Sequence, residues 1–217
     1  MTYTWDASTR RYRDQQSGRL IRTDRIAGLR DRIVTATLTK ADALSAQLAA
    51  GDLTVEAWTL GMRDLVKQVT IEQYLLARGG RNAMGPRDWG RIGYQLRTQY
   101  GYLQQFAAEV DAGRLSDKQI AARARLYIEA TRSAFERANG AAWGVLLPAH
   151  PGDGGSECGV NCRCRWRLSA NELGEVEATW VIDSAAESCG TCQERAEQWA
   201  PLVFPAPMPG IEAPIAA

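Results

Sequence analysis

Between about residue 24 and residue 139, the apolar positions recur every three to four residues, which is the spacing of amphipathic helices. Glycines interrupt this pattern, and one Gly-Pro pair restarts it; such residues commonly end or begin a helix. Ser116 and Gln119 form an S-x-x-Q capping box before the last stretch. The pattern therefore predicts four helices joined by short connections, which favours an antiparallel bundle. Their expected ranges are about 24–50, 55–79, 86–113 and 117–139.

The segments on either side of this helical region have different patterns. Residues 1–22 show no helical period and carry aromatic residues among arginines, so we expect an extended arm or a short hairpin that turns at Ser17-Gly18. The last residues, 201–217, hold five of the eight prolines. Such a segment suits neither a helix nor a central strand, so we expect an extended tail that is ordered only on a partner.

The region from residue 141 to residue 200 is turn-rich at first and then alternates. Arg163–Leu168 and Val176–Ile182 are predicted strands, and Ser169–Glu175 would join them as a hairpin. Cys189–Trp199 has a helix-forming composition. The fold class expected is mainly α: a helical bundle followed by a small α+β region. The expected organisation is an arm (1–22), a bundle (23–140), a cysteine-rich hairpin-plus-helix region (141–200) and a proline-rich tail (201–217).

Composition limits the possible functions. The 217 residues include 26 basic and 25 acidic side chains, a net charge of +1, so there is no overall electrostatic case for nucleic acid or a membrane surface. No apolar run is long enough to span a bilayer, and the polar start has no apolar stretch typical of a secretion signal. We therefore expect a soluble protein that stays in the cell that makes it.

Charge is unevenly distributed, because the first 32 residues carry eight arginines against four aspartates. Arginines interleaved with Tyr and Trp can contact nucleic acid, but they are also typical anchors on acidic protein partners. We favour protein docking for this segment. The candidate partner-binding residues are Tyr3, Trp5, Arg10, Arg11, Tyr12 and Arg13.

All the cysteines of the chain lie in one short stretch near its C-terminal end. They are Cys158, Cys162, Cys164, Cys189 and Cys192. An odd number of cysteines in a chain without a secretion signal argues against a disulfide framework and indicates metal or redox chemistry.

A structural zinc ion takes four sulfur or nitrogen ligands in a tetrahedron, and cysteines on both sides of a hairpin can supply them in a treble-clef-like arrangement. Cys189 and Cys192, at the first turn of the expected helix, form the firmer pair because the exposed N–H groups there favour thiolates. Of the other three cysteines, we expect Cys162 to bind together with Cys158 or Cys164, with His150 as an outside candidate. Such a closed site has no catalytic role.

Other interpretations of these residues are weaker. The cysteines could be small buried apolar side chains, but free cysteines seldom cluster in this way. The strand followed by C-G-T-C at a helix start is superficially similar to the active-site turn of thioredoxins. Only 25 residues follow Cys192, however, and no βαβ pattern precedes it. The single histidine, His150, lies in a linker, so a Ser-His-Asp or Cys-His catalytic site is not indicated, and no residue is assigned a catalytic role.

Three segments resemble the minor head, or head-morphogenesis, proteins of tailed bacteriophages, the Mu F-like family. These segments are LPAHPGDGGSECGVNCRCRW, the D-x5-C-x2-C of Asp183–Cys192, and RRYRDQQSGRLI near the start. His150-Pro151 and Cys162-Arg163-Cys164 match the family's H-P…C-R-C signature, separated by a ten-residue insertion. The C-x2-C follows the C-R-C segment here, whereas it precedes it in the more usual members.

The resemblance implies a non-enzymatic protein of the virion head, made in the host cytoplasm and acting in head assembly and in genome packaging or ejection. Its implied partners are the portal and coat proteins, with packaged DNA left open and no membrane, and it implies several copies in a symmetric assembly. Two alternatives remain at this point: a cytosolic dithiol oxidoreductase that uses Cys189 and Cys192, and a zinc-stabilised nucleic-acid-binding adaptor.

Overall fold

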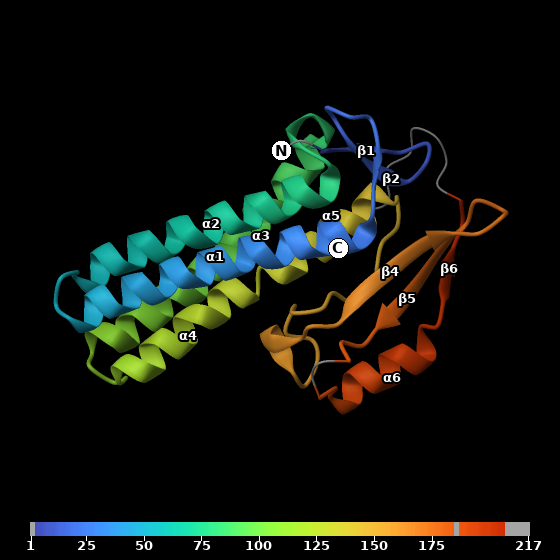
Figure 1. The fold of residues 1–217 in the computed structure, drawn as a ribbon. Coiled ribbons are helices and arrows are strands. Elements are labelled where there is room, and N and C mark those ends of the chain that lie inside the picture. Colours follow the sequence, from blue (N-terminus) through green and yellow to red (C-terminus); the bar gives the residue numbers. More distant parts are fainter. Residues whose placement is uncertain (1–2, 185–186, 207–217) are drawn as a thin grey trace.

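The computed structural model describes residues 3–184 and 187–206, and it is mainly helical, as the sequence predicts. Long helices form an elongated bundle, and a small sheet with one helix lies beside one end of this bundle (Figure 1). The bundle helices are α1 (Thr23–Ala49), α2 (Val55–Arg78), α3 (Pro86–Asp111), α4 (Asp117–Glu129) and α5 (Arg132–Ala142). A short 3-10 turn, η1 (Arg81–Ala83), connects α2 to α3.

Local signals explain where these helices begin and end. The Thr54 hydroxyl accepts a hydrogen bond from the Ala57 N–H at the start of α2, at 3.1 Å. Pro86 opens α3. The predicted capping box forms at α4, where the Ser116 N–H donates to the Gln119 side chain at 2.9 Å. Sequence-local chemistry therefore sets where α2, α3 and α4 begin.

The predicted fourth helix is two helices, α4 and α5, which is a correction to the sequence prediction. The Thr131 hydroxyl donates to the Ile128 carbonyl at 2.6 Å, and the Ser133 hydroxyl donates to the Ala130 carbonyl at 2.8 Å. Such bonds compete with the helical backbone pattern and break it here. The second helix also runs past Gly140, where a Cβ atom would lie 3.0 Å from the Leu147 side chain.

The bundle core centres on α2, whose inward side chains Trp58, Met62 and Val66 are fully buried. Trp58 packs edge-on against Phe106 of α3, with 5.4 Å between the ring centroids. Phe106 in turn stacks on Tyr127 of α4 at 5.8 Å. None of the described helices is both long enough and apolar enough to cross a membrane.

The N-terminal segment is a folded sheet rather than an extended arm or a single hairpin. Its strands β1 (Tyr3–Asp6), β2 (Arg11–Asp14) and β3 (Leu20–Ile21) are antiparallel and lie in the order β1-β2-β3. The Tyr12 hydroxyl donates to the Ala77 carbonyl at 2.6 Å. Gly79, with φ +78, ends α2 very close to this sheet. A Cβ atom at Gly79 would lie 2.1 Å from the backbone nitrogen of Trp5. The sheet therefore docks on the C-terminal end of α2.

The C-terminal region contains the predicted hairpin, β4 (Arg165–Ala170) and β5 (Val176–Val181), followed by α6 (Gly190–Gln198). A further strand, β6 (Leu202–Phe204), pairs antiparallel with β5 on the side away from β4. The prediction that the tail orders only on a partner is wrong for this strand, because it completes the chain's own sheet as an edge strand. Residues 207–217 lie outside the described residues.

A buried ion pair joins the bundle to the C-terminal region. Arg30 of α1 donates to the Glu136 carboxylate of α5 at 2.9 Å. The second carboxylate oxygen of Glu136 accepts a hydrogen bond from the backbone N–H of Trp166 in β4 at 3.4 Å. Burial raises the pKa of Glu136, and Arg30 opposes this shift. Three elements that are distant in sequence therefore meet at one carboxylate.

Replacing Glu136 by Ala should lower the free energy of unfolding by about 3–5 kcal/mol, because Arg30 would lose its buried counter-charge and keep only the half-exposed Asp31 as a partner. The measurement is urea denaturation followed by circular dichroism. The matched control is Asp42→Ala, which breaks the exposed Asp42–Arg125 pair and should cost less than about 1 kcal/mol. Equal losses in the two variants would contradict this role of Glu136.

Candidate metal centre

The five cysteines converge where the loop before β4 meets the N-terminus of α6. Cys158 immediately precedes a 3-10 turn, η2 (Gly159–Asn161), and Cys162 immediately follows it. Cys164 lies directly before β4, Cys189 is the N-cap of α6, and Cys192 lies in the first turn of that helix. All five are free thiols. The hairpin between the two groups returns the chain so that they face each other.

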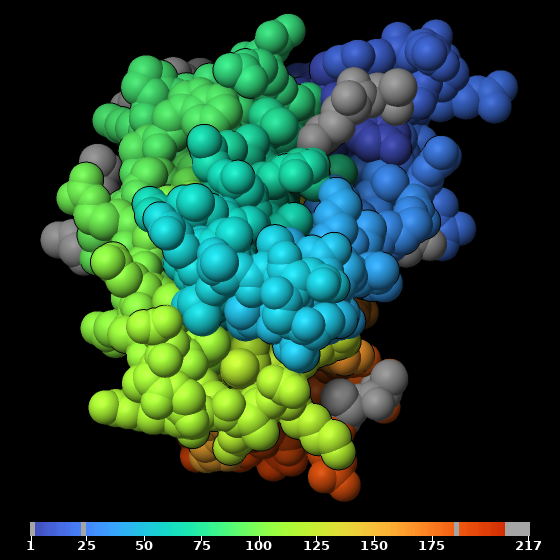
Figure 2. Space-filling view, turned by 90° about the vertical axis from the view of Figure 1, so that its left-hand side faces the viewer, coloured from blue at the N-terminus to red at the C-terminus, as the bar shows by residue number. Residues whose placement is uncertain are grey.

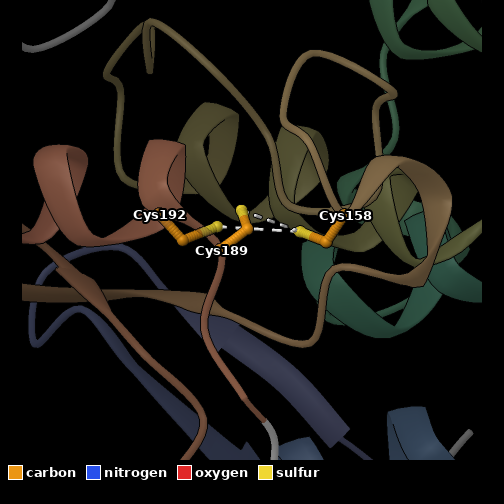
Figure 3. Close-up of side chains that lie close together, drawn as sticks. All are labelled: Cys158, Cys189 and Cys192. Carbon is orange, nitrogen blue, oxygen red and sulfur yellow. Dashed lines mark hydrogen bonds between the residues drawn. The ribbon is translucent and has the colours of Figure 1, made fainter.

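The sulfur atoms are close enough to share an ion. Cys158 Sγ lies 3.5 Å from Cys189 Sγ and 3.8 Å from Cys192 Sγ (Figure 3). Cys162 Sγ lies 3.6 Å from Cys192 Sγ. Four sulfurs at the usual zinc distance of about 2.3 Å from an ion are about 3.8 Å apart, so these separations match a tetrahedral site.

The sulfurs form two groups of three, and within each group all the atoms lie within 4.8 Å of one another. One group is Cys158, Cys189 and Cys192, and the other is Cys162, Cys164 and Cys192. Cys192 belongs to both groups and is fully buried. The prediction of a cysteine cluster able to hold a metal ion is therefore confirmed, whereas the choice between Cys158 and Cys164 stays a prediction.

The thiols differ in how readily they lose a proton. Burial raises the pKa of Cys158 and of Cys192. Burial also opposes ionisation of Cys189, but hydrogen bonds from the Cys192 N–H and from Cys158 lower the pKa of Cys189 to about 7. A positive ion at the centre would favour the thiolate form of all its ligands.

The loop that carries Cys158 is held to α6 by contacts that sequence reasoning missed. The Glu157 carboxylate accepts the Gly190 N–H at the first turn of α6, at 3.0 Å. Arg195 of α6 donates to the Gly155 carbonyl at 2.6 Å. Both contacts join residues at least 33 positions apart, so no local signal in the sequence could indicate them.

Three tryptophans pack beside the sulfurs in the same small core. Trp166 of β4 packs edge-on against Trp180 of β5 at 5.2 Å and stacks on Trp199 at 5.4 Å. Arg195 lies over the rings of both Trp180 and Trp199. A core of this size gains much from a cross-link at its sulfur end.

His150, the outside ligand candidate, belongs to neither sulfur group. Its backbone N–H donates to the Asp153 carboxylate at 2.9 Å, and its ring is buried. Burial, together with the charges of Arg137 and Arg91, lowers the pKa of the imidazole to about 3, so the ring is neutral at physiological pH. The Asp153 carboxylate opposes this shift.

The candidate partner-binding residues of the N-terminal segment are largely occupied within the chain. The Tyr12 hydroxyl binds the Ala77 carbonyl, and Trp5 packs on Tyr12 and Trp143. Arg10 donates to the Gly174 carbonyl. Of the remaining three candidates, Tyr3 packs against the bundle core, Arg13 pairs with Asp6, and Arg11 is exposed.

Comparisons of the chain with protein-family models, with curated proteins and with solved structures found no match.

The reduced protein should bind one metal ion per chain, and Cys192→Ser should lose it, because Cys192 belongs to both sulfur groups. Four sulfurs complete a tetrahedron, so one of the single variants Cys158→Ser and Cys164→Ser should keep one ion while the other loses it. Metal content by mass spectrometry and competition with a colorimetric chelator are the measurements. Retention of a full equivalent by Cys192→Ser would contradict the assignment.

Proposed function

We propose that this chain is a non-enzymatic structural protein of a tailed-phage head, in which a zinc ion on four cysteines closes a treble-clef-like C-terminal region. The observation that carries the proposal is the cysteine cluster itself. It joins Cys162-Arg163-Cys164, which follows His150-Pro151 in the chain, to the C-x2-C at the start of α6.

Zinc is the ion that fits the donor set best. Thiolates are soft ligands that select zinc, copper(I) or iron–sulfur clusters over magnesium or calcium, and zinc takes four of them in a tetrahedron. When bound, it would supply a cross-link and no redox chemistry. The metal would hold the loop that carries Cys158 and Cys162 against α6. The Glu157–Gly190 and Arg195–Gly155 hydrogen bonds make the same connection.

The structural role is supported by how the sulfurs are enclosed. Cys162, Cys164 and Cys192 are buried in the core that contains the three tryptophans. Four sulfur ligands leave no open position for a substrate. The binding energy of the metal would then serve as folding energy for the C-terminal region.

The phage assignment is supported by the resemblance to the Mu F-like family and by a fold suited to docking. A helical body with two small sheets that contact each other at one end presents several faces to neighbours. On this proposal the partners are the portal and coat proteins, the protein is present in several copies in the virion head, and it acts in head assembly and in genome packaging or ejection.

A second candidate function is dithiol redox chemistry at Cys189 and Cys192. The observation that favours it is the C-G-T-C turn at the start of α6, with half-buried Cys189 as the more accessible thiol. This candidate gives no role to Cys158, Cys162 and Cys164, which lie against the same sulfurs. The metal centre gives a role to Cys162 and to one of Cys158 and Cys164 as well as to Cys189 and Cys192, so we favour it.

Removing the metal with a chelator under reducing conditions should abolish the near-ultraviolet dichroism of Trp166, Trp180 and Trp199, because their core would lose its cross-link. The far-ultraviolet helical signal should persist, because the bundle has its own core. Adding zinc back should restore the tryptophan signal. A tryptophan signal that is unchanged by chelation would contradict a structural metal.

In a lysate that produces the protein from its native locus, the protein should co-sediment with megadalton particles that also contain a portal and a coat protein. Size fractionation with mass spectrometry is the measurement, and Cys192→Ser should shift the protein to the small fractions. A protein that stays small, carries no zinc and reduces insulin disulfides would support the redox candidate instead.

A further inference from the structure

The outward face of α3 has an unusual composition. Its exposed or half-exposed polar side chains include Arg91, Tyr94, Arg97, Thr98, Tyr102 and Gln105. Tyr94 is 75% exposed and Tyr102 is 56% exposed, which is high for large aromatic side chains. Part of this helix forms the green flank of the molecule in Figure 2. We call these residues, with the glycines among them, the α3 face.

No carboxylate lies on the α3 face. Residues 89–108 form the longest stretch of the chain without Asp or Glu. The acidic residue just before it, Asp88, is buried and paired with Arg78 at 3.2 Å. Within the described part of the chain, neither Arg91 nor Arg97 forms an ion pair. The face therefore keeps its positive charge although the chain as a whole is almost neutral.

The glycines of the α3 face have no packing role inside the molecule. A Cβ atom at Gly90, Gly93 or Gly101 would meet nothing within 4 Å. Glycine inside a helix costs about 1 kcal/mol relative to alanine, so three exposed glycines are expensive for the isolated fold. Their absence of side chains would let an extended partner approach the helix backbone closely.

The chemistry of the α3 face matches a phosphate backbone. Arg, Tyr, Gln and Thr side chains are common donors to phosphate oxygens. A protein partner would normally meet an apolar centre, but the exposed residues from Gly90 to Gln105 include no aliphatic side chain. Residues 91–105 extend about 21 Å along the helix, which corresponds to about six base pairs of duplex.

We propose that the α3 face binds duplex DNA through its phosphates, independently of sequence. The nucleic-acid contact expected for an adaptor is thereby placed on α3 and not on the N-terminal segment. Two arginines of that segment are occupied within the chain, Arg10 by the Gly174 carbonyl and Arg13 by Asp6. This surface is independent of the cysteine cluster.

The test uses the full-length, reduced, zinc-loaded protein and a fluorescein-labelled 30-base-pair duplex of mixed sequence. Fluorescence anisotropy is recorded between 50 and 200 mM NaCl. Wild-type affinity should fall steeply with salt. Arg91→Glu with Arg97→Glu should weaken binding about tenfold or more. The slope of the logarithm of the binding constant against the logarithm of the salt concentration should become shallower by about 2 in the same double variant. Each arginine that neutralises a phosphate accounts for about one unit of that slope.

The matched control is Arg11→Glu with Arg19→Glu, which makes the same change in net charge on the exposed N-terminal sheet. It should bind within about twofold of wild type. Gly101→Leu adds bulk without changing charge and should weaken binding several-fold, while circular dichroism shows an intact fold in every variant.

Three results would overturn the proposal. One is wild-type protein that does not bind the duplex at 50 mM NaCl, and another is an equal loss of affinity in the Arg11/Arg19 control. The third is a change of sedimentation coefficient in the Arg91/Arg97 variant without DNA, which would make the face an interface between copies. The particle-fractionation result is separate, because duplex binding by the purified chain does not depend on a portal or coat protein.

Discussion

The position of the C-terminal region depends on one buried carboxylate, that of Glu136. Its oxygens accept from Arg30 of α1 and from the Trp166 backbone of β4, while Glu136 itself belongs to α5. A buried carboxylate needs this counter-charge, because burial alone raises its pKa and disfavours the ionised form. The core of the bundle and the core of the C-terminal region therefore meet through an electrostatic requirement.

Two further contacts strengthen this junction from the N-terminal side. Trp5 of β1 packs against Trp143, which follows α5, at 5.6 Å. Arg10 reaches across to the Gly174 carbonyl in the β4–β5 turn at 2.9 Å. The first strands of the chain thus contact its last third, and aromatic and arginine residues that look like a free docking arm are used to hold the molecule together.

The cysteine cluster lies near the end of the C-terminal region where α6 begins. Glu157, Arg195 and the sulfurs all connect the same loop to the same helix, so the metal would complete a junction that hydrogen bonds already define. This arrangement separates the tasks of the molecule. With a metal bound, the sulfur end would stabilise the C-terminal region, while the outward side of α3, on the bundle, is exposed.

The sequence by itself determined the elements whose signals are local. The apolar period, the Gly-Pro pair at Pro86 and the capping box at Ser116 predicted the helices, because a helix is stabilised by neighbours three and four residues away. The β4–β5 hairpin and the grouping of the cysteines were equally readable. The convergence of the two cysteine groups could be predicted, because the hairpin between them returns the chain to its starting point.

Only the tertiary structure decided what depends on distant residues. The pairing of Leu202–Phe204 with β5 orders the start of the tail, although the proline-rich sequence predicted order only on a partner. The same holds for charge: the arginines of the N-terminal segment and of α3 are alike in sequence, but Arg13 faces a carboxylate and Arg97 does not. Ion pairing is set by atoms brought together across the fold, so composition alone cannot say which charges stay available.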